Sequence, residues 1–501
     1  MDIFGQLLDG IKMLLGWEPI LIILAGVVMG ILVGVLPGLS PAMGVALLVP
    51  FSYGLEPLYA LILLVSVYSA ANYGGTITAI AINTPGTPSA IVSTFDGYPL
   101  TQKGEPGKAL GASVIASTVG GLFGTIVLIF FSVPLAKAAL SFGPAEYFAL
   151  AIFGLTITSS LSTGNWLKAF IATLIGLLLN TVGMDPFTGY FRFTFDIPEL
   201  ADGFSFIPAL IGLFALGEIF LQIENNLEVK GHLKKISGKM PKFKEIWSIK
   251  RTIAQSSVLG TLIGVVPGAG ATIAAFIAYN EAKRISKHPE QFGKGALDGV
   301  AASGAATSGS VGGALVPLLT LGIPGSAATA VLIGALVLHG LTPGPELFKG
   351  DSPIVYGIFA SMFIAYTAMF FFGFLGNQLW IKIIKAPKSV LYPAIISIAF
   401  IGSYSVGNSM FDVWSCFGFG LLGWILRRND FPTPPVILGL ILGFLAETNF
   451  RRALLMDNAS IFFTRPISLI LLILAALSLF YPILKLKFSK TKTNEYNKEE
   501  K

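Results

Sequence analysis

Two short segments far apart in the sequence are nearly identical. Residues 34–38 read Gly-Val-Leu-Pro-Gly, and residues 264–268 read Gly-Val-Val-Pro-Gly, at an offset of 230 residues. A second pair follows in the same order, because residues 83–87 read Asn-Thr-Pro-Gly-Thr and residues 322–326 read Gly-Ile-Pro-Gly-Ser. We call these segments break 1 (34–38), break 2 (83–87), break 3 (264–268) and break 4 (322–326). Their matched order predicts that the chain contains two halves of one repeat.

Each break lies within an apolar stretch. Proline removes a backbone donor and glycine admits backbone angles that a helix does not use, so each break should end one helix and start another inside the membrane. Irregular backbone at that depth is stable only where it lines a cavity or is buried in protein. A simple proline kink would explain any one break. Matched breaks in two halves are instead typical of a transporter binding site.

The composition predicts an all-α polytopic membrane protein. Hydrophobic residues make up 54% of the 501 positions and charged residues 12%, which is about half the charge of a soluble domain. Lipid offers backbone groups no hydrogen-bond partner, so the apolar runs should be helices, and we expect roughly 10–12 membrane segments. The clearest runs are residues 17–36, 58–82, 109–131, 166–184, 204–223, 354–374 and 467–484. Residues 1–18 have neither a basic n-region nor a cleavage site, so we expect no cleaved signal peptide.

Basic loops predict the orientation in the cell (plasma) membrane. Residues 225–252 hold eight Lys or Arg against two Glu, and the positive-inside rule places such a loop in the cytoplasm. The basic tail should also be cytoplasmic, which leaves the N-terminus outside. The chain then divides into a first membrane repeat (17–224), a basic cytoplasmic linker (225–252), a second membrane repeat with C-terminal helices (253–484) and a cytoplasmic tail (485–501).

The charges that flank breaks 1 and 3 predict two re-entrant hairpins. The apolar residues around break 3 lie between two basic stretches, so this segment should enter and leave on the cytoplasmic side. The segment around break 1 has acidic flanks and should enter from outside. Entry from opposite sides predicts two inverted repeats, the architecture of alternating access.

The breaks supply groups that suit a small anion and a small cation. Helix N-termini after Gly86 and Gly325 present free N–H groups and the positive end of the helix dipole, which favour a carboxylate. The candidate substrate-binding residues are Asn83, Thr84, Pro85, Gly86, Thr87, Gly322, Pro324, Gly325 and Ser326. Unwound carbonyls and hydroxyls suit sodium, and the candidate ion-binding residues are Pro37, Gly38, Ser40, Gly75, Thr76, Pro267, Gly268, Thr307, Ser308 and Ser310. The alternative is that these small residues only permit close helix packing, above all at residues 305–310 and 312–313.

The sequence does not predict an enzyme. It has no nucleotide-binding loop and no His-Glu-x-x-His motif, and the single cysteine, Cys416, excludes a disulfide or a cysteine-based metal site within the chain. We expect no cofactor and no metal apart from a transported sodium ion. Glu218, Asp298 and Glu447 lie in or near apolar segments and are candidates to bind protons or cations, although a structural ion pair or an interfacial position is the simpler explanation for each.

The residues around break 2 resemble a known family. The run Tyr-Gly-Gly-Thr-Ile-Thr-Ala-Ile at residues 73–80, followed by break 2 and by Asp-Gly-Tyr-Pro at residues 96–99, is similar to the signature of the tripartite tricarboxylate transporter large permease family (TctA). The second half agrees at residues 279–281, 313–326 and 339–345, and the resemblance extends from about residue 26 to residue 465.

This resemblance implies a secondary active permease that imports citrate and related di- and tricarboxylates with a sodium or proton gradient. It also implies a small membrane subunit and an extracytoplasmic solute-binding protein as partners, and no nucleic acid. The chain departs from the family at residues 303–308, where Ser-Gly-Ala-Ala-Thr-Ser replaces an expected Pro-Glu-x-x-Asn-Asn, so the substrate and the coupling ion stay open. The alternative function is a stand-alone carboxylate permease or channel-like protein that needs no solute-binding protein.

Overall fold

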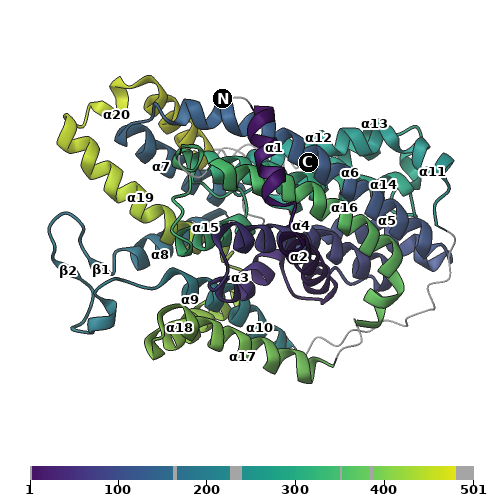
Figure 1. The fold of residues 1–501 in the computed structure, drawn as a ribbon, viewed down its shortest axis with the longest axis horizontal. Helices are drawn as coiled ribbons and strands as arrows, with labels where there is room; N and C mark the ends of the chain where they lie inside the picture. The colour runs from purple at the N-terminus through teal and green to yellow at the C-terminus, as the bar shows by residue number, and fades with distance from the viewer. Residues whose placement is uncertain (1–2, 162–165, 226–239, 350–351, 384–386, 481–501) are drawn as a thin grey trace, which may run out of the picture. The chain divides into compact units, whose positions relative to one another are not determined.

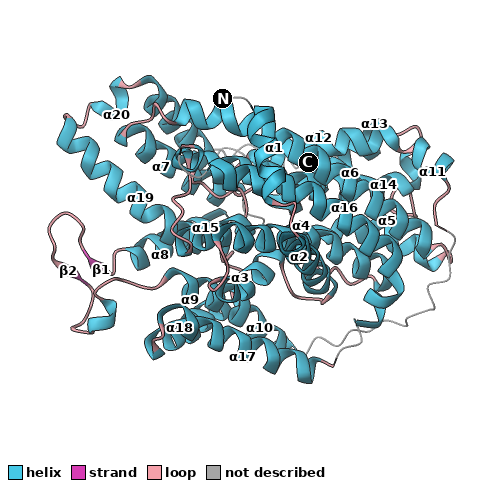
Figure 2. Cartoon of the chain, in the orientation of Figure 1, coloured by secondary structure: helices cyan, strands magenta, loops and turns pink. Residues whose placement is uncertain are grey.

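The structure is a computed structural model, and it describes all residues except 1–2, 162–165, 226–239, 350–351, 384–386 and 481–501. Helices make up most of the described chain (Figures 1 and 2), which confirms the predicted all-α class. Half of the basic linker (226–239) and the whole cytoplasmic tail lie outside the described residues. Their predicted positions therefore stay predictions.

Within the described residues, seven helices are long and apolar enough to cross a membrane. They cover Trp17–Val35, Pro57–Ile82, Pro106–Ala139, Phe206–Asn225, Leu297–Leu321, Pro353–Gly376 and Ser389–Gly407. Four shorter apolar helices cover Pro41–Ser52, Trp166–Asn180, Ala327–Leu338 and Pro466–Phe480. The chain is a multi-pass membrane protein, because segments of this length and hydropathy are stable as helices in lipid.

The described residues form two compact units. Unit 1 comprises residues 1–140 and 205–425, and unit 2 comprises residues 141–204 and 426–501. All four breaks belong to unit 1. This division follows spatial contacts and cuts across the two predicted repeats, whose inverted relationship stays a prediction.

The N-terminal part of unit 1 contains breaks 1 and 2. Its helices are α1 (Ile3–Met13), α2 (Trp17–Val35), α3 (Pro41–Ser52), α4 (Pro57–Ile82), the 3₁₀ helix η1 (Pro88–Ala90), α5 (Ile91–Gln102) and α6 (Pro106–Ala139). Break 1 thus separates α2 from α3, and break 2 separates α4 from η1 and α5.

The later part of the chain repeats this order around breaks 3 and 4. Its helices are α9 (Phe206–Ile211), the π-helix η3 (Gly212–Leu216), α10 (Gly217–Asn225), α11 (Phe243–Ser248), α12 (Lys250–Val265), α13 (Gly270–Ile285), η4 (Pro289–Gln291), α14 (Leu297–Leu321), α15 (Ala327–Leu338), η5 (Pro345–Phe348), α16 (Ser352–Ile383), α17 (Lys388–Gly407) and α18 (Met410–Arg428). Helices α12 to α16 correspond in order to α2 to α6.

Close helix packing holds the two halves of unit 1 together. Helix α14 packs along α6, and the same pairing in the other half places α16 along α4. Glycines make the first of these contacts tight, since a Cβ at Gly120 would collide with the backbone of Ala305 and one at Gly124 would lie 2.6 Å from the carbonyl oxygen of Gly309. Small residues at such crossings let helix backbones approach closely. This packing matters in a membrane, because lipid provides no hydrophobic driving force for helices to associate.

Unit 2 is a smaller helical group with one short hairpin. Its elements are α7 (Pro144–Leu161), α8 (Trp166–Asn180), the antiparallel strands β1 (Gly183–Met184) and β2 (Phe191–Arg192), η2 (Pro198–Leu200), α19 (Pro434–Met456) and α20 (Ile461–Thr464). A Cβ at Gly439 of α19 would lie 2.9 Å from the Cα of Gly176 of α8, so these two helices also cross at glycines.

Charged side chains join the hairpin of unit 2 to α19. Arg192 pairs with Glu447 at 2.7 Å, and Arg451 pairs with Glu447 at 2.9 Å and with Asp185 at 2.9 Å. The backbone N–H of Phe187, which donates to Asp185 at 2.8 Å, is the main cause that lowers the pKa of Asp185 to about 2. Glu447 therefore has the structural ion pairs that the sequence suggested.

Candidate functional site

Breaks 1 and 3 interrupt their helices in the same way. Helix α2 ends at Val35 and α12 ends at Val265, and α3 and α13 begin a few residues later. Gly38 has φ 89° and Gly268 has φ 79°. Both glycines occupy the left-handed region, which costs a residue with a Cβ more than it costs glycine. The sequence prediction that Pro-Gly ends these helices is confirmed at both positions.

Breaks 2 and 4 have matching backbones although their sequences differ. Asn83 has φ 56° and Gly322 has φ 71°, and each is the first residue after its helix. The next N–H groups bond back to corresponding carbonyls, from Thr84 to Thr78 at 3.5 Å and from Ile323 to Pro317 at 3.2 Å. Each helix thus ends at a left-handed residue, as helices commonly do, and the following N–H bonds six residues back into the last turns of the helix. Asn83 can replace glycine because asparagine tolerates the left-handed region better than most residues.

The two breaks within each half lie against each other. In the first half, Gly86 donates its N–H to the carbonyl oxygen of Gly75 at 3.2 Å, and a Cβ at Gly86 would collide with the carbonyl oxygen of Gly34. In the second half, Gly268 donates to Gly325 at 3.2 Å. The structure therefore brings together the candidate residues of breaks 1 and 2, and likewise those of breaks 3 and 4.

The helix ends that follow breaks 2 and 4 differ. Break 4 leads directly into α15, where the Ser326 hydroxyl accepts from the N–H of Thr329 at 3.3 Å as a capping residue. Break 2 leads first into the 3₁₀ turn η1. There Pro88 has no N–H and the N–H of Ala90 is bonded to Thr87 at 3.0 Å. The expected row of free N–H groups is thus reduced after break 2, because the chain turns before α5 begins.

Comparison with known proteins supports the family that the motifs resemble. The sequence matches the tripartite tricarboxylate transporter TctA family over residues 20–438. It is 38% identical over 430 residues to an uncharacterized 52.8 kDa protein of the TAR-I ttuC' 3' region of Agrobacterium vitis, covering 85% of this chain and 86% of that protein.

The chain belongs to the tripartite tricarboxylate transporter TctA family. A second relative, an uncharacterized protein of the TAR-II ttuC' 3' region of Agrobacterium vitis, is 39% identical over 215 residues, which cover 42% of this chain and 89% of that protein. No solved structure matches the chain.

Most hydroxyls proposed as ion ligands in this TctA chain bond to their own helices or to neighbouring ones. Thr76 donates to the carbonyl of Tyr73 at 2.8 Å and contacts Ser113 at 2.9 Å, and Ser310 donates to Thr307 at 2.7 Å. The buried Ser308 hydroxyl has no hydrogen-bond partner among the described residues.

Packing accounts for the glycines of the same stretch of the TctA chain. A Cβ at Gly313 would collide with the backbone of Thr261, and one at Gly264 would collide with the backbone of Ser310. Helices α12 and α14 therefore need small residues where they cross. The packing alternative thus explains Gly312 and Gly313, whereas ion binding at Thr307, Ser308 and Ser310 stays a prediction.

The structure adds residues that the sequence did not single out. The hydroxyl of Tyr68, on α4, lies 3.0 Å from the Ser326 hydroxyl and so joins the first half to break 4. Gln222 of α10 lies directly over Gly38, where a Cβ would collide with the Gln222 amide. The amide of Gln222 donates to Glu218 at 3.0 Å and accepts from Tyr392 at 3.1 Å.

A sequence signal existed for Gln222 but not for Tyr68. Glu218 and Gln222 stand four residues apart at the end of an apolar run, a spacing that places two polar side chains on one helix face. They follow directly on the π-helical turn η3, a feature that is frequent at functional sites. Tyr68 instead lies within a buried apolar helix, and nothing in its spacing separates it from core residues.

Proposed function

We propose that this chain is the permease subunit of a secondary active transporter that imports small di- and tricarboxylates such as citrate, coupled to a sodium or proton gradient. The observation that supports this proposal most is the pair of matching broken helices at breaks 2 and 4. Broken helices at corresponding places of two halves are where transporters of this general architecture hold substrate and coupling ion. Family membership agrees with a carboxylate as the transported group.

In this proposal the two breaks hold the substrate jointly near the bilayer midplane. Ser326 and the start of α15 supply N–H groups and the positive end of a helix dipole, which stabilises an anion by roughly 0.3–2 kcal/mol. Asn83 contributes its side-chain amide from the other half. A few such weak contacts give reversible binding, which a transporter needs in order to release its substrate on the other side.

The proposal includes orientation and partners. The N-terminus lies outside and the C-terminus in the cytoplasm of the plasma membrane. A small membrane subunit and an extracytoplasmic solute-binding protein complete the system, as expected of a large subunit of a tripartite family. In the alternative the chain transports carboxylates by itself, and uptake by the isolated chain without either partner would favour that alternative.

Uptake at low substrate concentration tests the site. Membrane vesicles that contain the chain and its partners are given radiolabelled citrate or succinate well below saturation. We expect Asn83→Gly and Ser326→Ala to reduce uptake while the protein stays folded and inserted. Asn83→Gly preserves the left-handed backbone, so its effect reports on the lost amide. Normal uptake by both variants would move the site to breaks 1 and 3.

A further inference from the structure

A fully buried carboxylate connects the two halves of unit 1. Asp96 lies on α5, the helix that follows break 2, and its side chain is 0% exposed. One carboxylate oxygen accepts from the N–H groups of Gly293 and Gly295, each at 2.8 Å, and of Ala296 at 2.7 Å. The other accepts from the Tyr279 hydroxyl at 2.8 Å. All four donors belong to α13 or to the loop that leads from α13 to α14.

The loop is shaped to receive this carboxylate. Gly293 has φ 82° and Gly295 has φ 103°, and successive N–H groups in such turns form a concave site for an anion. The same loop accepts a second contact from the first half, because the Lys103 ammonium donates to the carbonyl of Lys294 at 2.6 Å. A buried charge is costly unless hydrogen bonds replace its water, and here four donors do so.

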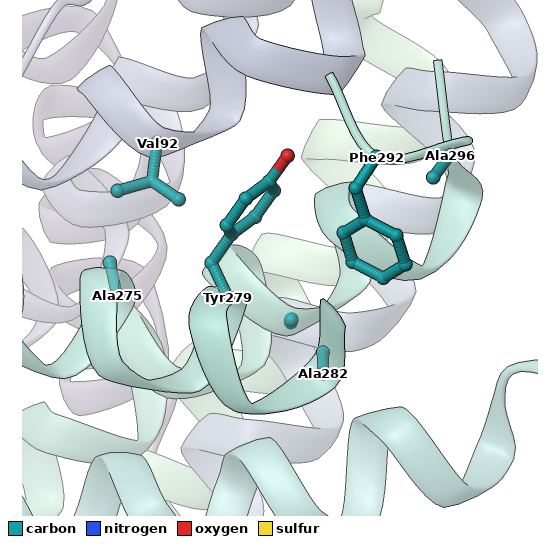
Figure 3. Close-up of a cluster of buried hydrophobic side chains, with 7 residues drawn as sticks. Val92, Ala275, Tyr279, Ala282, Phe292 and Ala296 are labelled. Carbon is teal, nitrogen blue, oxygen red and sulfur yellow. The ribbon is translucent and has the colours of Figure 1, made fainter. Parts of the chain in front are cut away.

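Apolar side chains close around this contact. The Tyr279 ring lies between Val92 of α5 and the residues Phe292 and Ala296 (Figure 3), all of them buried. The Phe95 ring also meets Tyr279 edge-on, with centroids 5.5 Å apart. Separating α5 from the α13–α14 loop would therefore expose both the Asp96 carboxylate and the apolar cluster around Tyr279.

The other half of the repeat has a contact of the same kind but of lower strength. Helix α15, which follows break 4, is succeeded by His339. Its Nε2 atom lies 3.1 Å from the Ser52 hydroxyl at the end of α3. Each post-break helix thus reaches the hairpin of the opposite half. The first does so through four hydrogen bonds to a carboxylate, and the second through one hydrogen bond between uncharged or weakly basic groups.

We propose that Asp96 is a positioning residue that locks α5, the helix that follows break 2 and η1, against the α13–α14 loop. The lock closes this side of unit 1 in the conformation described, and the His339–Ser52 contact is the corresponding weaker lock of the other half. This inference rests on the proposed transport function, in which each side must open once in a cycle. It assigns a role to the Asp-Gly-Tyr-Pro motif at residues 96–99, which the candidate site does not include.

A buried cysteine reports on the lock without any substrate. Ser93 lies one turn before Asp96, is 1% exposed and contacts the Ser303 hydroxyl of α14 at 2.9 Å. Ser93→Cys, in a background with Cys416→Ser, places a thiol at the interface that must separate when α5 moves. The rate of its modification by a membrane-permeant maleimide is measured in vesicles. It is compared among the parent, Asp96→Asn, Asp96→Ala and Tyr279→Phe.

The lock predicts a graded result. Each hydrogen bond to a charged group contributes substantially to closure. The cysteine at position 93 should therefore react at least about tenfold faster in Asp96→Ala than in the parent, and about threefold faster in Tyr279→Phe. The increase in Asp96→Asn should be smaller than that in Asp96→Ala. Glu290→Gln is the matched control. It changes an exposed acid of the same α13–α14 loop that pairs with His288 at 3.4 Å, and it should leave the rate unchanged.

Two outcomes would overturn the proposal. One is a rate for Asp96→Ala and Tyr279→Phe equal to the parent rate, with all three proteins monodisperse after purification. The other is an equal increase in Glu290→Gln, which would indicate general loosening of the loop. If Asp96→Ala fails to fold, the Asp96→Asn and Tyr279→Phe rates decide.

Transport kinetics give a second readout of a positioning role. Uptake of radiolabelled citrate by Asp96→Asn should show a lower maximal rate with KM changed less than about threefold, since the residue acts on opening rather than on binding. An unchanged maximal rate would count against the lock. If no protein, the parent included, transports any carboxylate, the proposed function fails while the maleimide rates still decide whether Asp96 locks α5.

Discussion

Gly268 donates its backbone N–H to the carbonyl oxygen of Gly325 across 3.2 Å, so break 3 is bonded directly to break 4. In the first half, Gly86 lies against the carbonyl of Gly34 and joins break 2 to break 1. A displacement at one break therefore changes the position of the other break in the same half. Under the proposed function, these contacts would connect an ion at breaks 1 or 3 with a carboxylate at breaks 2 or 4, as coupled transport requires.

Gly86 should tolerate no side chain. Gly86→Ala would place a Cβ against the backbone of Gly34 and 2.8 Å from the Cα of Gly75, where no flexible side chain can move aside. Overpacking of this kind costs roughly 1–3 kcal/mol or more. We expect a lower unfolding temperature and loss of uptake. Gly54→Ala is the control, because nothing lies within 4 Å of a Cβ there, and equal stability of the two variants would contradict the close approach.

Ser326 should stabilise the start of α15 independently of transport. Ser326→Ala removes the cap on the N–H of Thr329 as well as the contact with Tyr68. Loss of such a cap costs about 0.5–2 kcal/mol. Tyr68→Phe removes only the contact between the hydroxyls, so we expect the lower unfolding temperature in Ser326→Ala. A larger loss in Tyr68→Phe would show that the hydroxyl contact, rather than the cap, fixes break 4.

The repeated Pro-Gly segments predicted where the helices break, because proline and glycine act on the backbone at their own positions. The sequence predicted less well which residues meet at the breaks, because tertiary contacts determine this. The spacing of Glu218 and Gln222 indicated a polar helix face but not that Gln222 lies over Gly38, and no pattern indicated that Tyr68 reaches Ser326. Both contacts join elements far apart in the sequence. The 3₁₀ turn after break 2 also escaped prediction. Pro88 permits either a helix or a tight turn there, and the structure has a turn that packs against α13 and α14.

Asp185 should make unit 2 sensitive to acid. Its pKa in the folded protein is lowered from 3.8 to about 2, chiefly by the Phe187 N–H and also by the Thr188 N–H and by Arg451. The ionised form is therefore favoured by folding, so its contribution to stability is present above pH 4 and is lost as the pH falls toward about 2.

Thermal unfolding of the wild type and of Asp185→Asn tests this contribution. The wild type should unfold at the higher temperature at pH 7, and the difference should shrink between about pH 4 and pH 2. A difference that stays constant over this range would mean that packing around the side chain, and not its charge, stabilises the hairpin. Glu199→Gln, at an exposed position of the same connection, is the control and should have little effect at either pH.

The predicted orientation can be tested by labelling single cysteines. In a background without Cys416, Ser237→Cys in the basic linker and Ser489→Cys in the tail should react with a membrane-impermeant reagent only after the membrane is opened. Both positions lie outside the described residues. Thr188→Cys, in the loop between β1 and β2, should react from outside in intact cells. Labelling of Ser237→Cys from outside would contradict the predicted orientation and would indicate the reverse one.

The most direct test of secondary active transport is accumulation of a carboxylate against its own gradient. The chain and its partners are reconstituted in proteoliposomes, and a sodium or proton gradient is imposed while radiolabelled citrate or succinate is present at equal concentration on both sides. We predict that one of the two substrates accumulates inside, that dissipating the driving gradient abolishes accumulation, and that Asn83→Gly reduces it at low substrate concentration. Equilibration without accumulation under either gradient would contradict secondary active transport and would leave only a passive permease.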